Sequence, residues 1–420
     1  MNGNYEKKVI GKLLGFYRQR MNIDKLEIIQ ISNGKKICSL KTLKKIEEGT
    51  VVSDHYYDYL AVSLNMHFSL EENDVKLLQQ YHDQLISSLH VFSKSLMTEL
   101  LYDIEQSLYL MNNVIYFEEM LNLFHDILDY HLNENLPSRS TIDLYLALKE
   151  MVNHEDKKLI LYFLYQICNV VTYLDRSQIQ QECLPFYTDP LFIQNHLLHI
   201  SQNFIPFDAY HRIKNFYIQI KNQISDYQKI TIYSIMAMIQ LNMNDVKSAY
   251  KTICKILALI KSNPDYPDQL LLSLHMRATI VCYAMKQYEQ AIQNALICYH
   301  ASYKQLNYNH LLLFDALEKT NQISLLINLL KDSQTLSFHN EVVSKIFKYY
   351  QIKHLWPLTL IQKHRLLTDL ILNQLIPLCK YSELYQNILT EEMLAHVAIT
   401  RDYKSFYHFL QSNKSNHFHS

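Results

Sequence analysis

Glycine is confined to one end of this chain. All five glycines lie within the first 49 of its 420 residues, and none follows. Primed hairpin turns, dinucleotide fingerprints and phosphate-binding loops depend on glycine where φ is positive or where the backbone approaches a ligand closely. We therefore expect residues 50–420 to lack these features and to consist of helices joined by short polar turns. The predicted fold class is all-α.

Charge is also divided unevenly along the chain. The formal net charge is -1, but residues 1–49 hold eleven Lys or Arg against five Asp or Glu, so residues 50–420 are net acidic. Any nucleic-acid contact is therefore assigned to the N-terminal segment, because an acidic surface repels a duplex. A length of 420 residues with 49% hydrophobic content predicts two or three structural units with a sizeable core.

Residues 39–49 predict a short helix with a cationic face. Ser39 is a suitable N-cap, Gly49 is a suitable C-terminal stop, and Leu43 and Ile46 point inward together. The lysines of this stretch project outward: Lys41, Lys44 and Lys45. Helix-turn-helix proteins present such a helix to the major groove, where lysine meets phosphates or the acceptors of guanine. Taken alone, a lysine-rich solvated helix is the commoner explanation.

The neighbouring sequence favours the DNA-binding interpretation. Apolar residues recur at helical spacing over residues 10–17, which predicts an amphipathic first helix. A second short helix is expected at 22–29, capped by Asn22 or Asp24, and Ser53 opens a fourth helical segment. Four short helices within about 60 residues predict a compact helical domain at the N-terminus.

Three runs of residues from this segment resemble the Cro/repressor-like helix-turn-helix family of the xenobiotic-response-element type. They are IGKLLGFYRQRMNIDKLEI, ICSLKTLKKIEEG and SDHYYDYLAVSLNM, and the match covers residues 9–66. The resemblance implies a helix-turn-helix DNA-binding domain over residues 1–68 and double-stranded DNA as a partner. It also implies a structural ion pair between Arg18 of the first helix and Glu47.

The same resemblance assigns roles in DNA contact. The positions that match base-contacting side chains are Leu40, Lys41 and Lys45, and those that match phosphate contacts are Lys25, Ser39 and Thr42. Two features depart from the family pattern. The passage at 31–36 is about four residues longer than the usual tight turn. Leu40 is apolar where a polar residue is more common, and it meets either a thymine methyl or the domain's own core.

Residues 225–335 carry two helical hairpins with a recurring small residue. The run AMKQYEQAIQNAL resembles the tetratricopeptide repeat, whose small residue early in the second helix matches Ala249 and Ala291, 42 residues apart. A fainter copy puts Ser324 in that place. A small side chain is wanted where two helices cross closely. The resemblance implies an α-solenoid of such hairpins over residues 69–420 as a sensor and dimerisation domain.

Repeats of this kind commonly bind an extended peptide on their concave face. The repeat pattern places these residues on the inner face: Ser234, Met238, Asn242, Met276, Ile280 and Tyr283. The alternative is that methionine and tyrosine at helical spacing belong to the core.

A helix-turn-helix head followed by a helical-repeat body resembles the Rgg and PlcR kind of peptide-sensing, quorum-sensing regulators. That resemblance implies a cytoplasmic homodimer in which a short signalling peptide changes the spacing of two DNA-binding heads. A helical-repeat adaptor that binds a protein partner is the alternative function.

Enzymatic and metal chemistry find no support in the sequence. No HExxH, GxSxG or glycine loop is present, and His196 and His199 have no carboxylate at matching spacing, so we expect no enzyme, cofactor or metal. The N-terminus is charged from Glu6 onward and the longest apolar stretch, 159–171, is too short for a bilayer, which predicts a cytoplasmic protein without a membrane span. The seven cysteines form no CxxC pair and are expected to be reduced thiols: Cys38, Cys168, Cys183, Cys254, Cys282, Cys298 and Cys379.

Overall fold

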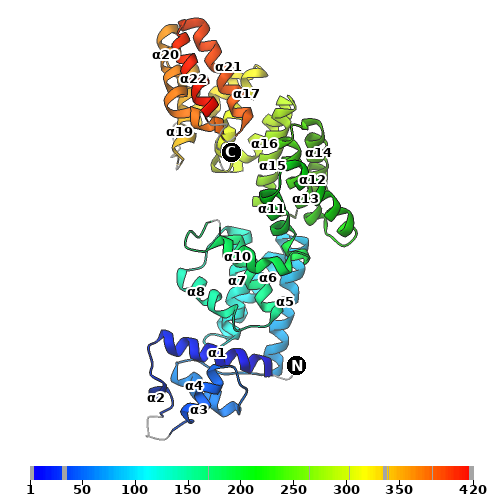
Figure 1. Ribbon diagram of the computed structural model, residues 1–420, viewed down its shortest axis with the longest axis vertical. Helices are drawn as coiled ribbons and strands as arrows, with labels where there is room; N and C mark the ends of the chain where they lie inside the picture. The colour runs from blue at the N-terminus through cyan, green and yellow to red at the C-terminus, as the bar shows by residue number, and fades with distance from the viewer. Residues whose placement is uncertain are drawn as a thin grey trace. The chain divides into compact units, whose positions relative to one another are not determined.

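Helices make up most of the chain that the structure describes (Figure 1). The computed structural model describes residues 4–30, 36–168, 170–263, 265–301, 303–333, 338, 340–380 and 382–415. Within these ranges there are two isolated β-bridges and no strand. The prediction of an all-α fold is therefore confirmed. None of the described helices combines the length and apolar content that a bilayer crossing demands.

Two compact units make up the chain. The N-terminal unit contains Met1–Asn203, Asn215–Ile232 and Asn263–Pro267, and the C-terminal unit contains Phe204–Lys214, Tyr233–Ser262 and Asp268–Ser420. The predicted boundary after residue 68 lies inside the N-terminal unit, so a separate domain over 1–68 stays a prediction.

The first four helices form what we call the head. They are α1 (Asn4–Arg20), α2 (Lys25–Ile28), α3 (Leu40–Glu47) and α4 (Asp54–Ser63). Their apolar faces converge on a core without solvent access: Val9, Ile10, Leu13, Leu43, Ile46, Tyr57 and Leu60. Asp24 accepts a hydrogen bond from the backbone N–H of Leu26, which fixes the start of α2. Residues 31–35 of the longer turn predicted between α2 and α3 lie outside the described residues.

Further helices follow the head in the N-terminal unit. They are α5 (Glu72–Val91), α6 (Lys94–Leu110), α7 (Phe117–Asn133), α8 (Arg139–Leu148), α9 (His154–Ile167), α10 (Arg176–Cys183) and α11 (Ile193–Asn203). The next helix, α12 (Pro206–Ile220), crosses the boundary between the units, as does α13 (Asp226–Asn242). Prolines stand at the starts of short 3-10 turns, where their missing N–H and fixed φ are tolerated.

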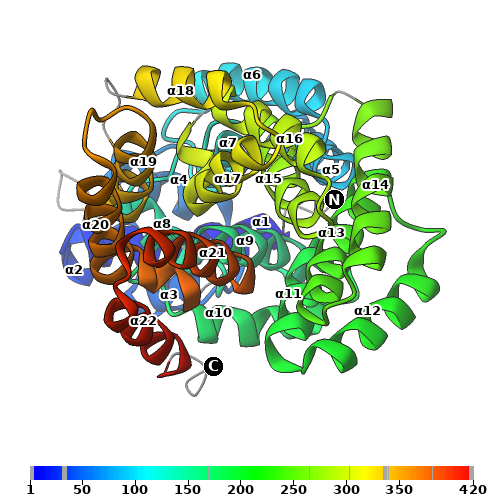
Figure 2. The same cartoon turned by 90° about the horizontal axis from the view of Figure 1, so that it is seen from above.

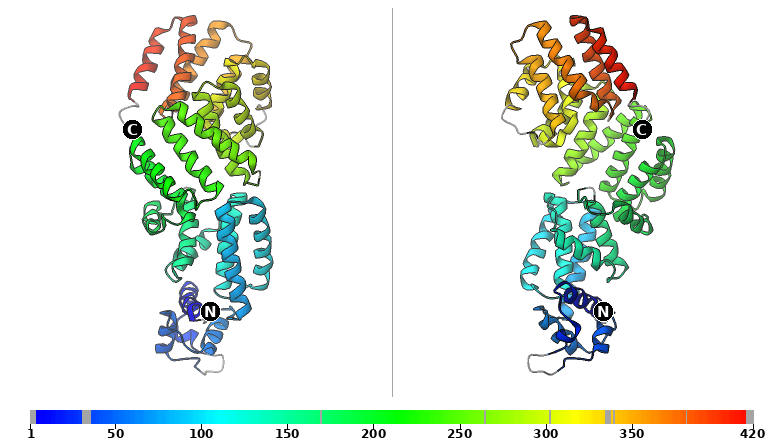
Figure 3. Two further views of the ribbon diagram at one scale, coloured as in Figure 1. Left: turned by 90° about the vertical axis from the view of Figure 1, so that its right-hand side faces the viewer. Right: turned by 60° about the vertical axis from the view of Figure 1, so that its left-hand side comes forward.

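The C-terminal unit is a stack of helical hairpins in which each helix from residue 246 onward packs against the next in sequence (Figures 2 and 3). After α13 its helices are α14 (Val246–Ser262), α15 (Asp268–Ala284), α16 (Tyr288–Ala301), α17 (His310–Lys319), α18 (Ile323–Asp332), α19 (Glu341–His354), α20 (Leu360–Leu370), α21 (Glu383–Thr400) and α22 (Tyr403–Ser415). This order confirms the predicted helical-repeat architecture.

The turns of three hairpins share one backbone feature. In each, a residue with left-handed φ reverses the chain: Asn244, Lys286 and Asn321. The residue five positions later packs at the helix crossing, and Ala249 and Ala291 are fully buried there. In the third hairpin that residue is Leu326, whereas Ser324 is exposed. The predicted register of the third copy was therefore wrong by two residues, because the preceding turn was not located.

Candidate nucleic-acid interface

Helix α3 is capped at its start and packed against the core along its inner face. The Ser39 hydroxyl accepts a hydrogen bond of 3.1 Å from the Thr42 backbone N–H, which caps the helix. The Thr42 hydroxyl in turn lies 2.9 Å from the Ser39 hydroxyl. Leu43 and Ile46 are completely buried beneath the helix. The hydroxyls of Ser39 and Thr42, predicted to meet phosphates, therefore also cap the helix start, and one hydroxyl hydrogen of the two is left for a further contact.

The outward face of α3 is cationic. Lys41, Lys44 and Lys45 are all exposed. The Lys44 ammonium lies 3.8 Å from a Glu48 carboxylate oxygen, while Lys41 and Lys45 form no ion pair with any residue that the structure describes. Leu40 is 45% exposed, so it does not pack into the domain's core. The face therefore offers two free ammonium groups beside one apolar side chain.

A nearly buried ion pair joins α1 to α3. Arg18 Nε lies 2.6 Å from Glu47 Oε1, and Arg18 Nη1 donates to the Ile23 carbonyl at 2.9 Å. The structure thus brings together the two residues predicted as an ion pair. Lys25 Nζ lies 3.2 Å from the second Glu47 oxygen and is half exposed. Removing either member of a buried pair strands the other charge, so this contact fixes how α3 is presented.

Two glycines allow α1 and α3 to approach each other, a role that helical periodicity alone did not indicate. A Cβ on Gly11 would lie 2.3 Å from the Ile46 carbonyl oxygen, and one on Gly15 would lie 3.0 Å from Glu47 Cγ. The signal that would have revealed it is their spacing of four residues, which puts both on one face of α1. Close approach of the helices is what buries Ile46.

Tyrosine–carboxylate hydrogen bonds tie the head to the helices that follow it in the N-terminal unit. The Tyr5 hydroxyl donates to Asp156 Oδ2 at 2.5 Å, and the Tyr17 hydroxyl donates to Glu119 Oε1. The His67 backbone adds hydrogen bonds to residues 113 and 115. These partners are separated by up to 151 positions, so no local sequence pattern pointed to them.

Burial raises the pKa of Glu119 to about 7, against an unfolded value of about 4.5. Between these values the folded chain binds the proton more tightly than the unfolded chain, so the stability contributed by this group falls as pH rises.

We expect the free energy of unfolding of the N-terminal unit to fall between pH 5 and pH 8, relative to Glu119→Gln, by on the order of 3 kcal/mol. Urea denaturation at both pH values measures this change in the free energy of unfolding. Glu99→Gln, on the exposed face of α6, should keep the wild-type slope; the same slope in Glu119→Gln would contradict the assignment.

The C-terminal unit contains a cavity of about 1030 Å³. Its lining includes three of the six predicted peptide-binding residues, Met238, Asn242 and Ile280. The other three lie elsewhere. Met276 packs against the hydrophobic core, the buried Ser234 hydroxyl accepts a hydrogen bond from Arg277, and the buried Tyr283 hydroxyl donates to Asp315.

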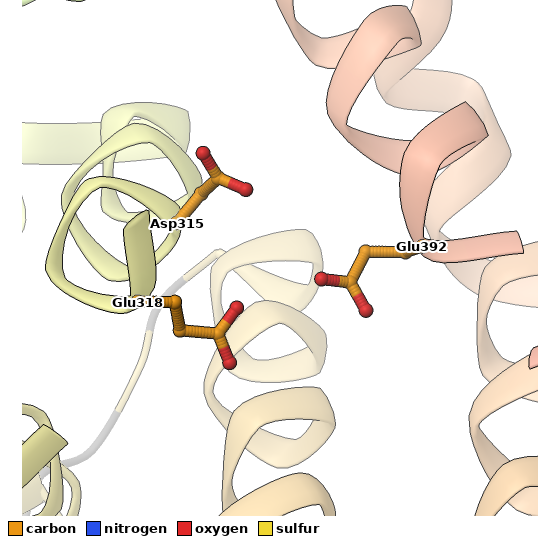
Figure 4. Close-up of side chains that lie close together, drawn as sticks. All are labelled: Asp315, Glu318 and Glu392. Atoms are coloured by element: carbon orange, nitrogen blue, oxygen red, sulfur yellow. The ribbon is translucent and has the colours of Figure 1, made fainter. Parts of the chain in front are cut away.

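Three carboxylates lie close together in the same unit: Asp315, Glu318 and Glu392 (Figure 4). Lys353 Nζ lies 2.8 Å from Glu318 and 2.6 Å from Glu392, and Lys319 Nζ lies 3.0 Å from Asp315. The His354 imidazole is 2.6 Å from the second Glu318 oxygen. The side chains of the protein itself therefore balance these charges, and the cluster acts as an ion-pair network between α17, α19 and α21.

Comparison with known proteins gives little similarity. No family model matches the chain, and no curated protein matches it. Among solved structures, it is similar to Bacillus thuringiensis PlcR, crystallised in complex with the peptide PapR7 and DNA. The sequence identity is 14%, the match covers 76% of this chain and 99% of that chain, and the TM-score is 0.24. At these values neither fold nor function is transferred from that protein to this chain.

Proposed function

We propose that the protein is a DNA-binding transcription regulator whose α3 enters the major groove. The observation that carries this proposal is that Lys41 and Lys45 are exposed and form no ion pair with the residues described, on a helix whose opposite face is buried. The major groove admits an α-helix, and lysine meets phosphate oxygens or the guanine acceptors there. The buried Arg18–Glu47 pair supports it, because a reading helix must be held in a fixed orientation.

We further propose that the C-terminal unit binds a short peptide and that the protein acts as a homodimer. The cavity of about 1030 Å³ has the size of a ligand site, and Met238 and Asn242 offer an adaptable apolar surface and a backbone-bonding amide. Two heads on one duplex face must match the spacing of two half-sites. A peptide regulates such a dimer only by binding its two arrangements with unequal affinity.

Salt dependence tests the DNA-binding proposal. Genomic fragments enriched on the full-length protein would be titrated at several KCl concentrations between about 50 and 200 mM. The logarithm of the association constant is expected to fall linearly with the logarithm of salt, with a slope of about -0.9 for each phosphate neutralised. An absent or flat response would contradict the proposal. It would favour the helical-repeat adaptor instead, for which the exposed Leu40 on α3 is a suitable protein contact.

A further inference from the structure

A small cavity lies within the N-terminal unit, where α1 meets α5, α7 and α9. Its volume is about 190 Å³, and it is separate from the cationic face of α3 and from the C-terminal cavity. Apolar side chains form part of its wall, among them Leu78, Phe117 and Met120. Its polar wall includes Glu6, His82 and Asp156. An amphipathic lining of this kind suits a small molecule with charged ends on an apolar stem.

Two polar groups in this wall have no partner among the residues that the structure describes. Glu6 is only 6% exposed as a residue, and its carboxylate, which is not sealed from solvent, forms no hydrogen bond or ion pair with those residues. The Nε2 atom of His82 is buried and has no hydrogen-bond partner in the described part of the chain. Leaving a polar group such as the His82 ring nitrogen buried without a partner costs free energy, whereas the amides in the first turn of α1 favour a carboxylate at Glu6. Both residues line the cavity, so their unused hydrogen-bonding capacity is available to a ligand there.

The remaining polar groups add negative charge to the wall of the cavity. Asp156 Oδ2 accepts hydrogen bonds from the Tyr5 hydroxyl at 2.5 Å and from the Tyr116 hydroxyl at 3.5 Å. Glu155 also lines the cavity but is held by Lys158 at 2.6 Å. The rings of Tyr5 and Tyr116 meet edge to face with centroids 6.2 Å apart. Carboxylates beside aromatic rings are the surroundings in which organic cations bind.

We propose that this cavity binds a small aliphatic amine, whose ammonium group donates to the Glu6 carboxylate. Its methylene stem packs against Leu78 and Met120. At about 30 Å³ for each water-sized group, the volume accommodates roughly six heavy atoms. The ligand would contact α1 of the head and α5, α7 and α9 together, so binding stabilises the attachment of the head. This binding does not depend on the proposed function in DNA recognition.

Isothermal titration of the full chain with 1,4-diaminobutane at constant ionic strength tests the proposal. 1,4-Butanediol has the same number of heavy atoms without charge and serves as the matched ligand. We expect saturable, one-site binding of the diamine and at least tenfold weaker binding of the diol. Glu6→Gln, which keeps the shape of the side chain, should weaken diamine binding at least tenfold. The control Glu99→Gln, on the exposed face of α6, should bind as the wild type does.

A second variant tests the location of the binding site by filling the cavity instead of removing a charge. Val75 lines the cavity from α5 and is only partly buried, so Val75→Trp fills the space with little risk to the core. We expect this variant to lose diamine binding while its circular dichroism spectrum and DNA affinity stay unchanged. Equal binding of diol and diamine, unchanged binding in both Glu6→Gln and Val75→Trp, or no saturable heat at all would overturn the proposal. Equal binding would show that the cavity does not select for charge, unchanged binding in both variants would place the amine elsewhere, and no saturable heat would show that the amine does not bind.

Discussion

Gly11→Ala is expected to destabilise the head by about 2 kcal/mol or more, although alanine is the better helix former. Alanine gains about 1 kcal/mol in an exposed helix interior. At this position, however, its Cβ would lie 2.3 Å from the Ile46 carbonyl oxygen, which is backbone and cannot rotate away. Overpacking of this kind costs about 3 kcal/mol or more, because α1 and α3 must separate. The recognition surface would then lose its fixed orientation.

Gly15→Ala is the matched control, one helical turn later on the same face. Its Cβ would meet Glu47 Cγ at 3.0 Å and Glu47 Cβ at 3.2 Å, so Glu47 and its ion pair with Arg18 need to move by only a few tenths of an ångström. We expect the gain in helix propensity to offset most of the cost, within about 1 kcal/mol. Hydrogen–deuterium exchange of peptides covering residues 40–49 measures the effect locally. Exchange should accelerate in Gly11→Ala and stay close to wild type in Gly15→Ala; equal protection in both variants would refute the close-approach account.

Local features of the head were predictable because they depend on neighbouring residues. The caps at Asp24 and Ser39 and the positive φ of Gly49 follow from side-chain chemistry within a few positions. The role of Gly11 depends on a helix almost 30 residues away, and the hydrogen bond of Tyr17 to Glu119 spans 102 positions. Periodicity gives the angle at which a side chain leaves its helix, but it does not say what meets that side chain.

The predicted peptide-binding residues illustrate this limit. Met238, Asn242 and Ile280 lie along the cavity of the C-terminal unit. Ser234 and Tyr283 were assigned to the same face from their spacing, but Arg277 and Asp315 reach them from adjacent helices and occupy their hydroxyl groups. Which positions on a helical face stay accessible is decided by the length and charge of the residues opposite, and a single helical pattern does not contain that information.

Simultaneous replacement of Lys41 and Lys45 with alanine is expected to lower operator affinity at least 100-fold near physiological salt. Both ammonium groups are exposed and unpaired among the described residues, so the change removes charge without stranding a partner. For each lysine that meets a phosphate, its replacement should reduce the salt slope by about 1. Lys247→Ala with Lys251→Ala, exposed on α14 with the same spacing of four residues, is the control and should bind DNA as the wild type does.

Comparison of the operator with a scrambled duplex separates the two kinds of lysine contact. If Lys41 and Lys45 meet only phosphates, affinity for both duplexes falls by the same factor, because phosphate contacts carry no sequence information. If either lysine meets a guanine, the operator loses more, by about 1 to 3 kcal/mol for a good contact. Since Leu43 and Ile46 hold the buried face of α3, the circular dichroism spectrum should not change in either case. Full operator affinity in the double variant would remove α3 as the DNA-contacting element.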